Sequence, residues 1–170
     1  MDEYIVQKVD EHGTKRYFKD GKLHRKNGPA LINKREGIIE WYEDGQLHHD
    51  NAPARKKSDG TEEWYQYGYL HNDNDEPAIT RSNGYKAWYL NGKLHRDDDL
   101  PAIIHPELGF KEWYCNGHLH RENGPAIVKK DGTQLWYNNG KELLKHPKSK
   151  ELEKTNNSFT TTLKSLFKLS

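Results

Sequence analysis

The chain has 170 residues, of which 31% are charged and 32% hydrophobic, with a mean hydropathy of −1.17 and a formal net charge of +1. Such a polar chain cannot bury a large apolar core, and its charge gives no overall attraction to nucleic acid or to a membrane. Disorder is excluded because disordered chains are poor in aromatic residues, whereas this one has five Trp and ten Tyr. A single cysteine, Cys115, rules out an internal disulfide framework and a zinc knuckle, which needs several cysteines.

The first residues, MDEYIVQKVD, lack the apolar segment of a signal peptide. No apolar run elsewhere is long enough to span a bilayer. These features predict a cytoplasmic protein, which means the host cytoplasm if the protein is viral.

A unit of about 24 residues recurs from residue 3 to about residue 143. Each unit holds an aromatic pair, a glycine, a Leu-His pair and a Pro-Ala pair, as in "GKLHRKNGPA" at 21–30 and "GHLHRENGPA" at 117–126. The Leu-His pairs begin at Leu23, Leu47, Leu70, Leu94 and Leu119, and the prolines of the Pro-Ala pairs are Pro29, Pro53, Pro77, Pro101 and Pro125. All five tryptophans belong to this pattern, so the repeats make up most of the protein.

Turn residues indicate what one repeat looks like. Two series of glycines recur with the repeat, several of them in Asp-Gly or Asn-Gly pairs such as Asn91-Gly92, which are the strongest short signal for a β-hairpin. We therefore expect two strands per repeat, one starting at Pro-Ala, as in "PAIVKK", and one ending in Trp-Tyr, as in "TQLWY". The predicted fold is all-β: an elongated, twisted single antiparallel sheet of about six hairpin repeats, which buries only a stripe per repeat.

The cycle Trp-Tyr-x-Asn-Gly-Lys-x-His, closed by a glycine and a short strand, resembles the repeats of the MORN family. The resemblance implies successive β-hairpins in one twisted antiparallel sheet, and a function in binding proteins or acidic lipids. The version "LHRxNGPA" is similar to divergent repeats in proteins of bacteriophages and large DNA viruses. Some bacterial members of the family are described as antitoxins.

The recurring His-Arg pairs have two interpretations. Neighbouring histidines should lie roughly 10 Å apart, two strands away from one another, which is too far for a shared metal ion. We favour a structural role, in which each histidine hydrogen-bonds the backbone of an adjacent glycine turn. The alternative is a row that binds phosphate or carboxylate groups, made of His24, Arg25, His95, Arg96, His120 and Arg121.

The middle repeats depart most from the common pattern, and these departures are free to carry specificity. Their connecting loops read "HHDNAPA", "HNDNDEPA" and "HRDDDLPA", and repeat three adds tyrosines beside its tryptophan. Aromatic residues next to acidic ones suit a protein interface, where the charges steer association with a basic partner. A solvated edge that discourages aggregation is the alternative. The candidate partner-binding residues are Tyr65, Tyr67, Tyr69, Asp73, Asp75, Glu76, Asp97, Asp98 and Asp99, and the acidic ones are expected to contribute little to folding.

The change of composition predicts a repeat domain at 1–143, followed by a separate segment at 144–170 that consists of a linker and an amphipathic helix. Phe159, Leu163, Leu166 and Phe167 have the spacing of an amphipathic helix, and Ser158 fits its N-cap. We expect this helix to cap the last repeat. The alternative is that it binds a membrane surface or the groove of a partner.

No catalytic motif is complete, so the sequence predicts a protein that is not an enzyme and needs no cofactor or metal. "HRDDDL" at 95–100 resembles a kinase catalytic loop, but the other kinase motifs do not accompany it. Our main hypothesis is a non-catalytic binding protein, a viral or bacterial inhibitor or antitoxin that blocks a host or toxin protein through the sheet surface. The alternative is a binder of phosphorylated ligands or acidic lipids through the His-Arg rows and the lysine-rich tail.

Overall fold

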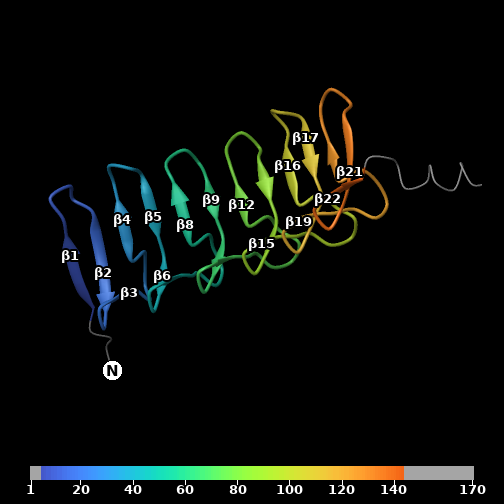
Figure 1. Ribbon diagram of the computed structural model, residues 1–170. Helices are drawn as coiled ribbons and strands as arrows, with labels where there is room; N and C mark the ends of the chain where they lie inside the picture. The colour runs from blue at the N-terminus through green and yellow to red at the C-terminus, as the bar shows by residue number, and fades with distance from the viewer. Residues whose placement is uncertain (1–4, 144–170) are drawn as a thin grey trace, which may run out of the picture.

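The computed structural model describes residues 5–143 of the chain. Within this range the protein is all-β and contains no helix, so none of these residues forms a helix that could cross a membrane. The hairpins follow one another along an elongated, gently curved molecule, with the repeats in chain order (Figure 1). The predicted helix and the predicted separate segment at 144–170 lie outside the described residues.

One large antiparallel sheet contains 14 of the strands in the described part of the chain. Its strands follow chain order, so the sheet is a meander in which each repeat pairs with the one before and the one after. In spatial order it comprises β1 (Val6–Val9), β2 (Lys15–Lys19), β4 (Leu31–Asn33), β5 (Ile38–Glu40), β8 (Arg55–Lys57), β9 (Glu62–Glu63), β12 (Ile79–Thr80), β13 (Lys86–Ala87), β16 (Ile103–His105), β17 (Phe110–Glu112), β20 (Ile127–Val128), β21 (Gln134–Asn138) and β22 (Lys141–Leu143), with β3 (Lys22–Leu23) paired to β2.

The Pro-Ala pairs start strands, as predicted. β8 begins directly after Ala54, whose carbonyl accepts a 2.8 Å hydrogen bond from the N–H of Trp41. The five alanines of these pairs have no exposed surface, so a larger side chain would not fit there without displacing a neighbour. They are Ala30, Ala54, Ala78, Ala102 and Ala126.

The prediction of two strands per repeat is incomplete, because the chain leaves the main sheet at the tryptophan. The tyrosine that follows begins a second, short hairpin of two-residue strands. Its turn has the left-handed geometry of a type I′ turn, as at Asn91 (φ 49°) and Gly92 (φ 78°), which explains the Asn-Gly pairs. The short hairpins are β6 (Tyr42–Glu43) with β7 (Gln46–Leu47), β10 (Tyr65–Gln66) with β11 (Tyr69–Leu70), β14 (Tyr89–Leu90) with β15 (Lys93–Leu94), and β18 (Tyr114–Cys115) with β19 (His118–Leu119).

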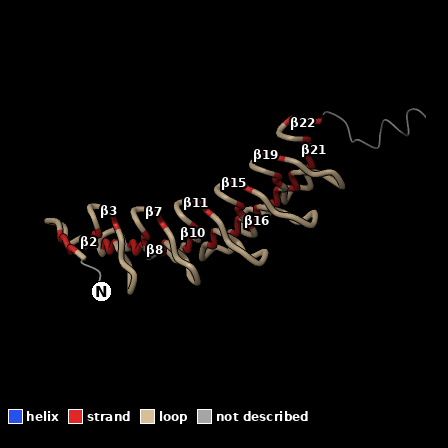
Figure 2. Tube along the Cα trace, turned by 90° about the horizontal axis from the view of Figure 1, so that it is seen from below, coloured by secondary structure: helices blue, strands red, loops and turns tan. Residues whose placement is uncertain are grey.

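The short hairpins form a row of their own beside the main sheet (Figure 2). The N–H of Gly68 donates a 2.8 Å hydrogen bond to the carbonyl of Leu47, one repeat earlier, and the same bond recurs along the row. After each short hairpin comes a connecting loop that leads back to Pro-Ala. The connecting loops are residues 24–29, 48–53, 71–77, 95–101 and 120–125.

The core is a thin stripe rather than a compact interior. Its buried apolar residues are the Pro-Ala alanines together with Ala87, Trp88, Ile103 and Trp113, and no large side chain among the described residues is fully buried. Because so little apolar surface is buried, polar contacts between repeats must contribute to how successive repeats stack. The polar composition of the chain is consistent with this.

Candidate binding surface

The histidine of each Leu-His pair joins its repeat to the next. Nδ1 of His95 accepts a 3.2 Å hydrogen bond from the backbone N–H of Asn116, in the following short hairpin. Because Nδ1 is the acceptor, the ring proton lies on Nε2, which donates to Oδ1 of Asp97 at 3.1 Å. The predicted bond from histidine to an adjacent turn is confirmed in all five repeats, where His24, His48, His71, His95 and His120 accept from Asp44, Tyr67, Asn91, Asn116 and Asn139.

The arginine after the histidine also joins two repeats. Nε and Nη2 of Arg96 each donate a 2.7 Å hydrogen bond to Asp75, in the preceding connecting loop. The guanidinium carbon lies 3.8 Å from the ring centroid of Trp88, so the same group makes a cation–π contact. One repeat later the arrangement recurs with Arg121, Asp99 and Trp113.

Loop length explains how these carboxylates reach the arginines. Two connecting loops are one residue longer than the other three, namely 71–77 and 95–101. In the first of them Asn74 and Asp75 both have left-handed backbone (φ 59° and 55°), which makes a type I′ turn. At the second corner of this turn Asp75 presents its carboxylate to Arg96 and its carbonyl to the indole N–H of Trp88, at 2.8 Å.

The structure thus pairs residues that the sequence assigned to two different surfaces. Arg96 and Arg121, candidates for anion binding, already hold Asp75 and Asp99, candidates for partner binding. An external phosphate or carboxylate would have to displace these internal partners from the guanidinium fork. The expectation that the acidic residues contribute little to folding therefore differs from the structure at both aspartates.

The remaining acidic candidates fall into two groups. Asp73 and Asp97 each lie about 3 Å from Nε2 of the histidine two residues earlier and accept a hydrogen bond from its N–H. Glu76 and Asp98 are exposed, and neither side chain forms a hydrogen bond or ion pair with another described residue. These two carboxylates remain free for contact with a partner.

The first repeat carries the other pair of anion-binding candidates. His24 is buried, and its Nδ1 accepts the backbone bond from Asp44. Arg25 stacks over Tyr17, 4.0 Å from the ring centroid, and donates to the carbonyl of Pro29 at 3.3 Å. This arginine therefore has the same stacking role as Arg96, with a loop carbonyl in place of a carboxylate.

Two of the candidate tyrosines lie at the exposed turn of the β10–β11 hairpin, and we call them the tyrosine tip. Tyr67 is 55% exposed and Tyr69 is 62% exposed, which makes them the most exposed large aromatic residues of the described chain. Tyr67 has a left-handed backbone with φ 44°, at a turn position that other short hairpins fill with Asp or Asn. Its ring stacks on His48, with 4.1 Å between the centroids.

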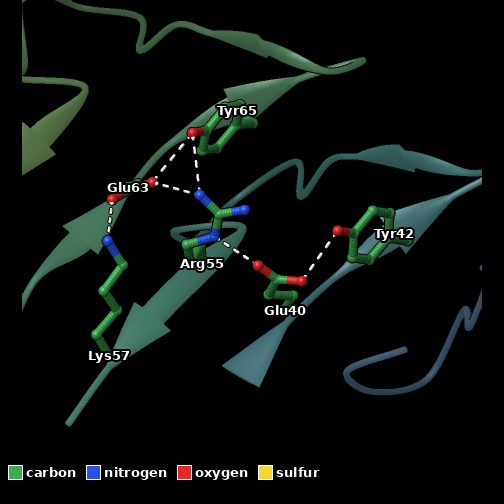
Figure 3. A network of polar contacts seen from close by, with 6 residues as sticks. All are labelled: Glu40, Tyr42, Arg55, Lys57, Glu63 and Tyr65. Carbon is green, nitrogen blue, oxygen red and sulfur yellow. Dashed lines mark hydrogen bonds and ion pairs between the residues drawn. The ribbon is translucent and has the colours of Figure 1, made fainter. Parts of the chain in front are cut away.

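Tyr65, the third candidate tyrosine, belongs instead to a polar network that is centred on Arg55, Glu40 and Glu63 (Figure 3). Its hydroxyl donates to Glu63, which also receives bonds from Arg55 and Lys57. Burial, together with the negative charge of Glu63, raises the pKa of Tyr65 to about 12. Tyr65 is therefore part of the scaffold rather than of the tyrosine tip.

Arg55 is the centre of this network, and sequence reasoning missed it. Its guanidinium bridges Glu40 on β5 and Glu63 on β9, both of which are buried. Burial opposes the charged form of Arg55, but the hydrogen bond and charge of Glu40 outweigh it and raise the pKa of the arginine. A signal was present in the sequence, because the residue after Pro-Ala is Leu or Ile in the other repeats and Arg only here.

Comparison with known proteins assigns no function: no family model matches the chain, and no curated protein matches its sequence. Function therefore has to be inferred from the side chains that the repeats place at the surface. Of the residues predicted from sequence, the tyrosine tip, Glu76 and Asp98 are exposed and free of internal ion pairs.

Proposed function

We propose that this chain is a divergent MORN-like repeat protein and acts as a non-catalytic binding protein. The β-repeat sheet is the scaffold, and the middle repeats provide the surface that contacts another protein. The tyrosine tip is the anchor of that surface, and the free carboxylates of the adjacent connecting loops form its rim. Interfaces of this kind combine a few large aromatic anchors with a polar edge.

The conformation of Tyr67 is the observation that carries this proposal. Asp and Asn tolerate left-handed backbone, whereas a bulky aromatic residue there costs on the order of 1 kcal/mol or more. The repeats use Asp44, Asn91, Asn116 and Asn139 at this position, so a less strained choice was available. The ring of Tyr67 stacks on His48, yet the residue stays more than half exposed, so we attribute the choice of tyrosine at this strained position to a contact with a partner.

The chemistry of the partner is inferred from the free charges of the connecting loops in the middle repeats. Glu76 and Asp98 project from neighbouring connecting loops without an internal cation. Unpaired carboxylates favour encounter with a basic protein surface and make the association rate sensitive to salt. An inhibitor or antitoxin that covers a basic region of its target would work in this way.

Affinity capture with repeat-matched variants tests the proposal. The bait is the full chain, used with a lysate of the organism that encodes it, and captured proteins are identified by mass spectrometry. The variant Tyr67→Asn/Tyr69→Lys gives repeat three the tip residues of repeat four, so the fold should be kept while specific capture is lost. The control His118→Lys installs the same lysine at the position of repeat five that matches Tyr69, and it should capture the same proteins as the wild type. Equal capture by wild type and the tyrosine variant would refute the proposed surface.

A further inference from the structure

The tryptophans that end the main-sheet strands have similar surroundings in most repeats. Trp88 and Trp113 are covered by the guanidinium groups of Arg96 and Arg121, at 3.8 and 4.0 Å from the ring centroids. At Trp41 the same position is filled by His49, whose ring lies edge-on at 5.6 Å between centroids. A planar, nitrogen-bearing group thus lies against each of these three indole rings.

Trp64 of repeat three is the exception. The residue in the arginine position is Asn72, whose side chain turns away to donate a 3.0 Å hydrogen bond to the carbonyl of Pro77. No cation–π or ring contact involves Trp64 within residues 5–143. The indole instead lines a hollow of about 500 Å³ between the connecting loops 48–53 and 71–77.

The indole N–H of Trp64 is also unused. In repeats four and five this group donates to the carbonyls of Asp75 and Asp99, both at 2.8 Å. The loop before Trp64 is one residue shorter and has no such turn, and no described residue accepts a hydrogen bond from this indole. Because no buried polar side-chain atom of the described chain lacks a partner, the N–H of Trp64 must be accessible to solvent.

The charge of the hollow completes the comparison. Four carboxylates line it, and its lining contains no Lys or Arg; the carboxylates are Asp50, Glu62, Asp73 and Glu76. Asp50 and Asp73 accept bonds from histidines, and Glu62 is 3.1 Å from Lys56, but Glu76 has no internal partner. The hollow therefore combines an indole that carries no stacked cation with an excess of negative charge, and it lacks the arginine that repeats four and five place on their tryptophans.

We propose that the hollow over Trp64 is a docking site for an arginine side chain of a basic segment in a partner protein. This inference rests on the proposed binding function and names the chemistry that the partner must present. Arginine fits better than lysine because a planar guanidinium can stack on the indole and direct its N–H groups to a carboxylate at the same time. Arg96 shows this double contact, on Trp88 and Asp75, within the protein itself.

Titration with short capped peptides, followed through the indole N–H signals of the ¹⁵N-labelled full chain, tests the site without the partner. The probes are acetyl-Gly-Arg-Gly-amide and the matched peptides that carry Lys or Asp. We expect a saturable shift of the Trp64 signal, assigned with Trp64→Phe, that is several-fold weaker with the Lys peptide and absent with the Asp peptide. The signals of Trp88 and Trp113, which are already covered, should not move.

Two variants connect the response to the vacant arginine position. Asn72→Arg introduces the arginine that repeats four and five have at this position. Its guanidinium should stack on Trp64 and abolish the peptide-induced shift, while Asn72→Gln should keep the shift. Thermal unfolding of both variants confirms that the fold is intact. The inference is overturned if the Trp64 signal does not shift, if Lys and Arg peptides act alike, or if a folded Asn72→Arg still responds. None of these results involves the tyrosine tip. A failure of the arginine site would therefore be distinguishable from a failure of the proposed binding function, which the capture experiment tests.

Discussion

Arg96 and Asp75 lie 21 residues apart in the sequence, yet two 2.7 Å hydrogen bonds join the guanidinium fork of the arginine to both oxygens of the aspartate. The pair links the connecting loops of consecutive repeats, and a second pair, Arg121 with Asp99, continues the link. The sequence analysis placed these aspartates and arginines on two separate surfaces, but the structure shows that they pair with each other and hold neighbouring loops together. The carboxylates that remain unpaired, Glu76 and Asp98, are therefore the acidic residues that are available for binding.

Asp75→Asn should lower the free energy of unfolding by about 1 kcal/mol, because one partner of a charge-assisted pair is lost while the turn can still form. The effect stays modest since the aspartate side chain is 54% exposed. Thermal or urea unfolding measures it. Glu76→Gln, in the same loop but without an internal partner, is the matched control and should unfold like wild type. Equal effects of the two substitutions would mean that the pair does not hold the loop.

The same pairs predict a pH dependence. Hydrogen bonds from Arg96 and Arg121 lower the pKa of Asp75 and Asp99 below the usual 3.8. Since the folded-state pKa is depressed, the pairs stabilise the protein fully above pH 3.8 and lose their effect as the pH falls through the folded-state pKa. The stability difference between wild type and Asp75→Asn/Asp99→Asn should therefore be constant near neutrality and shrink in acid. A difference independent of pH would contradict the pairing.

Local signals in the sequence were sufficient for the framework of the fold. Glycine turns, Pro-Ala strand starts and the histidine bonds recur at fixed offsets, and each depends on residues within a repeat or the next turn. The short hairpins were missed because a two-residue strand after Trp41 has too little periodicity to be recognised. The contact of Arg96 with Asp75 was missed because it depends on a turn formed by one inserted residue in another repeat. The missing arginine at Trp64 can be recognised only after the contacts of Arg96 with Trp88 and of Arg121 with Trp113 are known.

His95→Ala should lower stability by about 1 to 2 kcal/mol, because it removes the acceptor for the N–H of Asn116 and the donor to Asp97. His118→Ala is a suitable control, since His118 is exposed on a short hairpin and forms no such link. Unfolding midpoints in urea distinguish the two variants. If His95→Ala and His118→Ala unfold at the same urea concentration, the histidines of the Leu-His pairs do not stabilise the contact between repeats.

Arg55→Ala should be among the most damaging single substitutions, at roughly 3 kcal/mol, because it leaves the buried carboxylate of Glu40 without a cation and that of Glu63 with Lys57 alone. Replacing the whole set, Glu40→Ala/Arg55→Ile/Glu63→Ala, installs the residues that repeat four has at these positions, Ala87 and Ile103. We expect this triple variant to recover most of the loss, since an apolar replacement removes the need for pairing. A triple variant less stable than the single one would show that the network itself is required.

Site-specific cross-linking locates the working surface most directly. A photoreactive benzoylphenylalanine at position 69 replaces an exposed aromatic residue by another, and the same group at position 118 occupies the matching place two repeats later. After irradiation of cells that express each form, we predict a discrete cross-linked protein at position 69 that is absent at position 118 and is competed by unlabelled wild type. Cross-linking at position 118 alone, or with equal yield at both positions, would contradict the claim that the middle repeats carry the binding surface.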